Sequence, residues 1–393
     1  MSKKRSSGIF AVLFLIALIA VTSALVGCGG TTTTTAAPPA DTGTTAGPTT
    51  TAGAEPTTSE ATGQNGFQFG YSSPVASNQY IIAINKGQNV AADALGDKVQ
   101  QNDANLSPDK QVADIDSFVT MKVKGIISWT LDEGAATAAY ARAQAAGIPV
   151  VSENSPGQSV NTWTVTEDKM TRNSQIDAAK YIAERIPGAK FLVIGSQTTN
   201  YIRYTSQNMI DEGKKAGLTF LERQDNLIDV ASGAQQVVQD LLTKYPDTQA
   251  IWCYNDPSAL GASAAVRAAG KKVWNEGGDK SGVIIIGMNG APDAIDAIKN
   301  GYQTATYDTT PNQWGQVEVE LLDRVASGKM AVADMPKVLM FKSTRIDATN
   351  LDKWVDPNNA SYDAGLLDKM LNDPSATDPA VLDDYFAYVK TLK

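Results

Sequence analysis

The sequence predicts an α/β protein of two lobes, each built on a doubly wound parallel sheet, followed by a helical extension at the C-terminus. Short, near-continuous apolar runs are typical of strands that are covered on both faces. Helical segments with apolar spacings of three and four lie between these runs. The alternation continues for about 250 residues, which is long for one doubly wound sheet and favours two lobes.

The N-terminus of this 393-residue chain has the features of a secretory signal. Basic residues at 3–5 precede an apolar run at 9–26, and the segment 25–28 (Leu-Val-Gly-Cys) resembles the lipobox of bacterial lipoproteins. We therefore expect a signal peptide at 1–27 and a lipid on Cys28, the first residue of the mature protein. An uncleaved transmembrane anchor is the alternative, because about 18 apolar residues can just span a bilayer.

Residues 28–66 are rich in Thr, Ala, Gly and Pro and hold few charges and almost no bulky apolar side chains. Such a segment cannot bury enough surface to offset its conformational entropy, so we expect a disordered tether between lipid and lobes. Cys253 is then the single cysteine of the lobes. Its apolar neighbours predict a buried, inert thiol.

The lobes begin near Phe67 with a strand at about 67–71. Further strands are expected at 125–129, 148–151, 191–194, 250–253, 283–286 and 304–307. In each of these segments apolar and β-branched residues follow one another almost without interruption, as in strands of a parallel sheet that has helices on both faces.

Helices are expected between the strands, and residues that favour helix ends mark their limits. One helix covers about 81–95 and ends at Gly96, which offers a left-handed C-cap. A second begins with Ser107 as N-cap and Pro108 in the first turn. Alanine-rich helices at 134–146 and 258–269 also end at glycines.

Composition excludes several classes of function. The chain has no histidine, which excludes Ser-His-Asp and Cys-His triads and histidine-ligated metal sites. It has 33 basic and 42 acidic residues, and removal of the signal leaves 30 against 42, a net charge of −12. Such a chain repels phosphate backbones, which argues against nucleic-acid binding. We also expect no metal and no cofactor.

Short amide and carboxylate side chains follow five of the predicted strands. In open parallel sheets the ligand lies beyond the carboxyl ends of the strands. The residues at these ends are Asn78, Glu153, Asn154, Asn255, Asn289, Asp308 and Thr309, with Tyr80 and Trp129 nearby. Such groups make paired hydrogen bonds, and aromatic faces stack on C–H surfaces, so the set suits a small, neutral, hydroxyl-rich ligand. The alternative is that they are ordinary helix N-caps and loop residues.

Several segments, in the expected order, resemble the ribose/galactose-type periplasmic binding proteins, the type I family with a LacI-like sugar-binding core. They are Asn78-Gln79-Tyr80, 87–96, 146–150, 254–262, 286–290 and 305–315. The resemblance spans roughly residues 67–342. It implies two lobes that are joined by three crossings of the chain and that close on a sugar.

Domain limits follow from this resemblance. The first lobe would comprise 67–166 and 309–336, and the second 167–308 and 337–345. Residues 346–393 exceed what the family fold needs. They are too apolar for a free tail, so we expect short helices that begin near 364 and 379 and pack on the lobes.

In the first lobe the resemblance assigns ligand contacts to Asn78 and Tyr80, with Tyr80 as a stacking platform. Glu153 stands where the family commonly has an aspartate that accepts hydrogen bonds from sugar hydroxyls. The arginine that usually follows this aspartate is here Asn154. Trp129, at a strand end near the expected cleft, is a further candidate.

In the second lobe Arg203 matches an arginine near the start of a helix, and Asn255 matches the asparagine of the family's Asn-Asp pair. Asn289 stands where an aspartate is usual. Asp308 or Thr309 occupies the place of a polar hinge residue. These departures from the family pattern leave the identity of the sugar open.

The resemblance implies a lipid-anchored solute-binding protein of an ABC importer, which is not an enzyme and binds a small carbohydrate. It would be a monomer in the cell envelope, outside the cytoplasm, held to the membrane only by its lipid, with ABC permease subunits as partners. The alternative is a sensor of the same fold that serves a chemoreceptor or a sensor kinase. A transcriptional regulator would need an N-terminal DNA-binding segment, and a hydrolase would use paired carboxylates such as Glu153 and Asp308.

Overall fold

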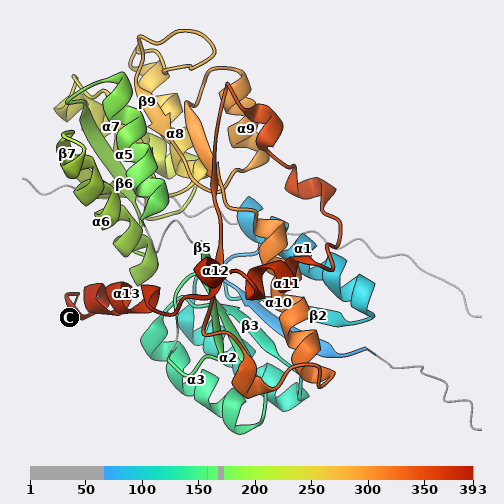
Figure 1. Cartoon of the computed structure of the whole chain (residues 1–393). Coiled ribbons are helices and arrows are strands. Elements are labelled where there is room, and N and C mark those ends of the chain that lie inside the picture. Colours follow the sequence, from blue (N-terminus) through green and yellow to red (C-terminus); the bar gives the residue numbers. More distant parts are fainter. Residues whose placement is uncertain (1–65, 157, 167–171, 393) are drawn as a thin grey trace, which may run out of the picture. The chain divides into compact units, whose positions relative to one another are not determined.

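The computed structural model describes residues 66–156, 158–166 and 172–392. The predicted signal peptide, the lipidation site Cys28 and nearly all of the predicted tether lie outside these residues. Residues 62–393 form one compact unit, in which two lobes are visible (Figure 1). No helix in the described part of the chain is long and apolar enough to cross a bilayer.

The first lobe is built on a six-stranded sheet whose paired strands are all parallel. Its strands, in spatial order, are β11 (Val338–Phe341), β5 (Thr162–Thr166), β4 (Val150–Glu153), β3 (Ile126–Trp129), β1 (Gln68–Ser73) and β2 (Lys98–Asp103). Its helices are α1 (Gln79–Leu95), α2 (Pro108–Met121), α3 (Glu133–Ala145) and α10 (Pro311–Ala326). Ile127 and Val151 pack with α1 and α10, whereas the adjacent Ile126 and Val150 pack with α2 and α3. Helices therefore cover both faces, as the apolar runs predicted.

The second lobe repeats this arrangement. Its strands, in spatial order, are β12 (Thr344–Asp347), β10 (Ala305–Asp308), β9 (Ile284–Ile286), β8 (Ala250–Cys253), β6 (Lys190–Gly195) and β7 (Thr219–Asp225). Its helices are α5 (Asn173–Arg185), α6 (Asn200–Lys215), α7 (Ala231–Lys244), α8 (Asp256–Ala268) and α9 (Pro292–Lys299). All pairs are parallel except that between β10 and β12. The predicted class of two parallel-sheet lobes is confirmed.

Local sequence explains where the helices begin and end. Ser107 caps α2 by accepting a hydrogen bond from the backbone N–H of Lys110, at 3.2 Å. Asn255 caps α8 in the same way through the N–H of Ser258, at 3.0 Å. Gly96 ends α1 with a φ of 80°, in the left-handed region that glycine adopts without strain.

The chain passes between the two sheets after β5, after β10 and after β11. The sequence analysis placed 337–345 in the second lobe, and this assignment is corrected by the strand pairing. The buried run Val338–Phe341 pairs with β5 at the edge of the first sheet. Of this segment only β12 belongs to the second sheet, where it pairs with β10, so the third crossing lies at 342–343. The extension accordingly begins after Asp347, at the end of β12.

Helices α1 and α10 approach each other closely on one face of the first lobe. A Cβ atom on Gly87 would lie 1.9 Å from the backbone oxygen of Asn312, and one on Gly315 would lie 2.2 Å from that of Ile84. Glycine is therefore required at both positions, because any side chain would push the helices apart. This contact fixes the start of α1, where several candidate site residues lie.

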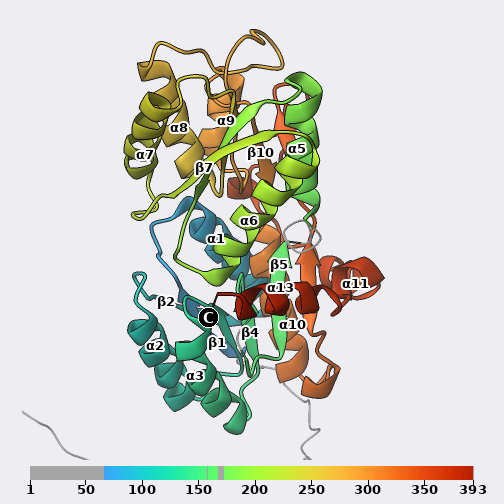
Figure 2. The same ribbon diagram turned by 90° about the vertical axis from the view of Figure 1, so that its left-hand side faces the viewer.

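The C-terminal extension consists of short helices. They are η2 (Leu351–Lys353), η3 (Pro357–Asn359), α11 (Leu366–Leu371), α12 (Pro374–Thr377) and α13 (Val381–Lys390), after a single turn η1 (Val332–Asp334) that precedes β11. Helices α11 and α13 begin close to the two predicted positions, and α12 was not predicted. Figures 1 and 2 show α13 beside α6, where Tyr385 packs on Trp163 of the first lobe and Tyr204 of the second.

Candidate functional site

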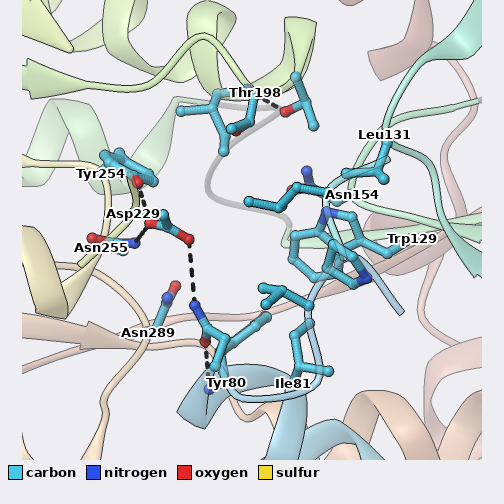
Figure 3. Close-up of a pocket in the computed structure, with 16 residues that line it drawn as sticks. Tyr80, Ile81, Trp129, Leu131, Asn154, Thr198, Asp229, Tyr254, Asn255 and Asn289 are labelled. Carbon is cyan, nitrogen blue, oxygen red and sulfur yellow. Dashed lines mark hydrogen bonds between the residues drawn. The ribbon is translucent and has the colours of Figure 1, made fainter. Parts of the chain in front are cut away.

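One pocket lies between the lobes at the carboxyl ends of the strands, and residues of both lobes line it. Six of the predicted site residues are among them: Asn78, Tyr80, Trp129, Asn154, Asn255 and Asn289. Figure 3 shows the polar group of Asp229, Tyr254, Asn255 and Asn289 facing Tyr80, Ile81 and Trp129 across the gap. The free space is about 70 Å³, room for a few water molecules. A larger ligand can enter only if the lobes move apart.

Asp229 is the centre of the polar side of the pocket. Its carboxylate accepts hydrogen bonds from the hydroxyl of Tyr254, from Nδ2 of Asn255 at 2.7 Å and from Nδ2 of Asn78 at 3.5 Å. The last of these joins the two lobes. Burial raises the pKa of Asp229, while the three hydrogen bonds favour its charged form.

The apolar side of the pocket is formed by aromatic rings of the first lobe. Tyr80 meets Trp129 edge to face, with ring centroids 5.8 Å apart, and Trp314 at 6.1 Å. The hydroxyl of Tyr80 accepts a hydrogen bond from Oγ1 of Thr309 at 3.2 Å. Contacts on three sides thus fix the orientation of Tyr80 as a platform for C–H surfaces.

Glu153, predicted to contact the ligand, does not line the pocket. It is the last residue of β4 and is fully buried, and its Oε2 accepts a hydrogen bond from the hydroxyl of Tyr71 at 2.8 Å. It lies beside the buried carboxyl of Glu318, and burial raises its pKa to about 7. The physical reason is the alternation of side chains along a strand, which turns Glu153 into the core and leaves the next residue for the cleft.

Asn154 takes the place in the pocket that was predicted for Glu153. Its φ of 64° lies in the left-handed region, which asparagine tolerates better than most residues. Its Nδ2 is buried and has no hydrogen-bond partner among the described residues. A buried donor without a partner is costly. A ligand hydroxyl or carbonyl at this point would satisfy it.

Asn255 and Asn289 line the second-lobe side of the pocket. Asn255 uses both ends of its amide, because Oδ1 caps α8 and Nδ2 holds Asp229. It is therefore a helix cap and a positioning group at once. Asn289 has a φ of 107°, and its backbone N–H donates to the oxygen of Tyr307 at 2.8 Å.

Three further predicted residues lie outside the pocket. Asp308 accepts a hydrogen bond from the backbone N–H of Thr310 at 2.8 Å, and burial raises its pKa to about 6. Thr309 reaches the site only through its bond to Tyr80. Arg203, on α6, lines a neighbouring hollow and donates from its guanidinium to the backbone oxygen of Gln197 at 3.3 Å.

Sequence reasoning missed several lining residues, of which Asp229, Thr198 and Thr199 are polar. The rule that ligands lie beyond strand ends would have found Asp229, because it follows β7 closely. Strand β7 was not predicted, however, since its sequence mixes charged and apolar residues. Thr198 and Thr199 follow β6 in the same way.

This arrangement can bind a hydroxylated molecule through hydrogen bonds and contacts with aromatic rings. A carboxylate and amides can accept and donate hydrogen bonds while an aromatic platform covers an apolar face. Among the described residues no three acidic or cysteine side chains gather as possible metal ligands. The geometry is that of a binding site formed between two facing surfaces.

Comparison with known proteins places this geometry in context. Residues 69–330 match the family described as Periplasmic binding protein domain. The ribose import binding protein RbsB of Bacillus subtilis is 27% identical over 67% of this chain and 83% of its own length. That of Escherichia coli K12 is 28% identical over 66% of this chain and 84% of its own length.

A solved structure gives the same fold at low sequence identity. The Caulobacter myo-inositol binding protein, bound to myo-inositol, has a TM-score of 0.65 and 23% identity. The match covers 73% of this chain and 95% of that structure.

Proposed function

Since this chain belongs to the periplasmic binding protein domain family, we propose that it is the solute-binding protein of an ABC importer for a sugar or similar polyhydroxylated molecule. The relatives named above are ribose import binding proteins, and a protein of the same fold was solved with myo-inositol. The family membership supports the class of function. The residues of the pocket support the class of ligand.

The observation that carries the proposal is the composition of the pocket between the lobes. The first lobe contributes Tyr80, Trp129 and Asn154, and the second contributes Asp229 and Asn289. A ligand that touches both sets stabilises the closed arrangement over the open one by the contacts it makes only when the lobes are together. The closed, loaded protein is then the form that a permease recognises.

A polyol fits the donors and acceptors of this pocket. Hydroxyl groups both donate and accept, so one can donate to the Asp229 carboxylate while another accepts from the free Nδ2 of Asn154. The C–H face of a ring would lie against Tyr80 and Trp129. The binding therefore depends on Asp229 and on the predicted Asn154, whereas Glu153 and Arg203, which the sequence also suggested, do not line this pocket.

We further propose that the protein is held at the outer side of a membrane by a lipid on Cys28. The support is the sequence alone: a basic start, an apolar run, the lipobox-like segment 25–28 and a flexible linker composition in the residues that follow. Replacement of Cys28 by serine should shift the protein from the membrane fraction to the soluble one. Unchanged membrane association would contradict the lipid anchor.

A thermal-shift screen of the purified protein against pentoses, hexoses, inositols and disaccharides tests the proposed function. A ligand at one hundred times its dissociation constant should stabilise the folded state by about 2.7 kcal/mol. Asp229→Ala should reduce this stabilisation to less than about 1 kcal/mol for the same compound at the same concentration. If no carbohydrate or polyol stabilises the protein, the proposal is wrong.

A further inference from the structure

A second, larger hollow adjoins the pocket between the lobes. It measures about 940 Å³, which is the size of a cavity that encloses a drug-sized ligand. Leu131, Thr198 and Thr199 line both spaces, so the pocket and this hollow are direct neighbours. We call the hollow the chamber.

Helix α13 builds one wall of the chamber, through Asp383, Phe386, Val389 and Lys390. This helix lies well beyond residue 330, where the match to the family ends. The wall is therefore an addition of this chain to the part that matches the family.

The wall is firmly attached to both lobes. Tyr385 is fully buried, with its ring centroid 5.5 Å from that of Trp163 and 5.6 Å from that of Tyr204. The adjacent Asp384 accepts hydrogen bonds from Tyr204 at 2.7 Å and from Arg172 at 2.9 Å. Buried rings and charged hydrogen bonds hold α13 in place while the lobes are together, so the chamber has a defined shape in the closed arrangement.

Charged groups of both signs line the chamber. The carboxylate of Asp132 caps α3 by accepting a hydrogen bond from the backbone N–H of Ala135 at 2.7 Å. The carboxylate of Glu133 accepts a hydrogen bond from the hydroxyl of Tyr385. Arg203 and Lys390 line the chamber and have no carboxylate partner among the described residues. The chamber thus keeps donors available to a ligand.

The balance of charge indicates what kind of group would fit. With Asp383, the chamber holds three carboxylates against two cations, which does not favour an anionic group. Hydroxyl groups can accept from Arg203 and Lys390 and donate to the carboxylates, and Phe386 adds an aromatic ring. A second sugar ring meets these requirements.

We propose that the ligand is a disaccharide or another glycoside, with one ring in the pocket between the lobes and the second group in the chamber beside α13. This inference rests on the proposed function and specifies its ligand. Arg203 and Lys390 are then contacts to the second group, while Asp229 and Asn154 hold the first ring.

Calorimetry with matched sugars tests the inference. The probes are glucose with maltose and cellobiose, and galactose with lactose and melibiose. At least one disaccharide should bind ten-fold or more tightly than either of its component sugars. Arg203→Gln and the exposed Lys390→Ala should each weaken that disaccharide about five- to ten-fold and change the affinity for the component sugar less than two-fold. Arg267→Gln, on α8 and outside both spaces, is the matched control and should change neither.

The outcomes separate this inference from the function on which it rests. If single sugars bind and no disaccharide binds more tightly, the chamber takes no second ring and only the inference is wrong. The same conclusion follows if Arg203→Gln and Lys390→Ala weaken single sugars and disaccharides equally. If none of these sugars or polyols binds at all, both the inference and the proposed function fall.

Discussion

Replacement of Glu153 by glutamine tests whether this residue belongs to the core, where the structure places it, or to the ligand site. Glutamine has nearly the same shape, and its oxygen can still accept the hydrogen bond from Tyr71. The change removes the charge and the titrating proton, and it replaces one carboxyl oxygen by an NH2 donor. It therefore isolates the electrostatic effect of one buried carboxyl from the effect of packing.

The magnitude follows from the pKa of the buried carboxyl. Burial raises the pKa of Glu153 to about 7 from an ordinary value of 4.5, and burial also raises that of the neighbouring Glu318. A raised carboxyl pKa means that the folded state binds the proton more tightly than the unfolded chain does. The protonated carboxyl of Glu153 therefore stabilises the folded state fully below about pH 4.5, and this stabilisation is lost as the pH rises through 7. Because the carboxyls of Glu153 and Glu318 interact, the loss belongs to the pair, and it is on the order of 3 kcal/mol.

Urea unfolding followed by tryptophan fluorescence at pH 5 and pH 8 measures this loss. Asp256 and Asp308 also have raised pKa values, about 7 and about 6, so the parent protein should lose stability over this interval for several reasons. Glu153→Gln should lose less, by an amount on the order of 3 kcal/mol. Glu184→Gln, which removes an exposed carboxylate of α5, is the control for net charge.

The result that refutes this reasoning is an equal loss of stability in the parent protein and in Glu153→Gln. The same variant should also leave ligand affinity unchanged, because Glu153 does not line the pocket. A large loss of ligand affinity, with an unchanged pH dependence of stability, would instead mean that Glu153 contacts the ligand, as the sequence suggested.

Three further predictions concern the pocket, the packing of the first lobe and the cysteine. Asp229→Ala should weaken ligand binding by about 2–3 kcal/mol, measured by calorimetry, because it leaves Asn255 and Tyr254 without their acceptor; unchanged affinity would exclude Asp229 from the site. Gly87→Ala should lower the free energy of unfolding by roughly 1–3 kcal/mol in urea, since its Cβ would meet the backbone of α10; full stability would mean that the helices separate without cost. Cys253 should resist alkylation in the folded protein and react after unfolding, as peptide mass spectrometry would show, because burial raises its thiol pKa well above the ordinary value.

The fold was predictable because its signals are local and repeated. Apolar runs, helix caps such as Ser107 and glycines such as Gly96 each mark an element without reference to the rest of the chain. Strand β7 was missed because it lacks such a local signal. Its residues are partly exposed, and its apolar and polar residues do not alternate clearly. The lobe to which β11 belongs could not be read from sequence, because a buried apolar strand fits the edge of either sheet.

The site was predictable to the level of strand ends but not of single side chains. A strand that is apolar on both faces gives no signal for which of its last residues faces the cleft, and so Glu153 was predicted together with Asn154, although only Asn154 lines the pocket. Arg203 was assigned by similarity of a helix start, yet its side chain lines the chamber. In both cases the residue was correctly placed near the site, and only the direction of its side chain was wrong. That direction depends on backbone geometry that the residue types do not encode.

The hydrogen bonds of Asp229 show how the pocket can bind tightly without a second charge. Two second-lobe donors, Tyr254 and Asn255, hold the carboxylate in place. The bond from Asn78 of the first lobe is longer, at 3.5 Å, and weaker for that reason. If a ligand hydroxyl replaces Asn78 as the third donor, little hydrogen-bond energy is lost, and the lobes are then connected through the ligand. The carboxylate is already oriented before the ligand binds, so none of the free energy of binding is needed to order it. The lobes would then close when the ligand binds, because the ligand supplies the third hydrogen bond to Asp229, which Asn78 makes only weakly.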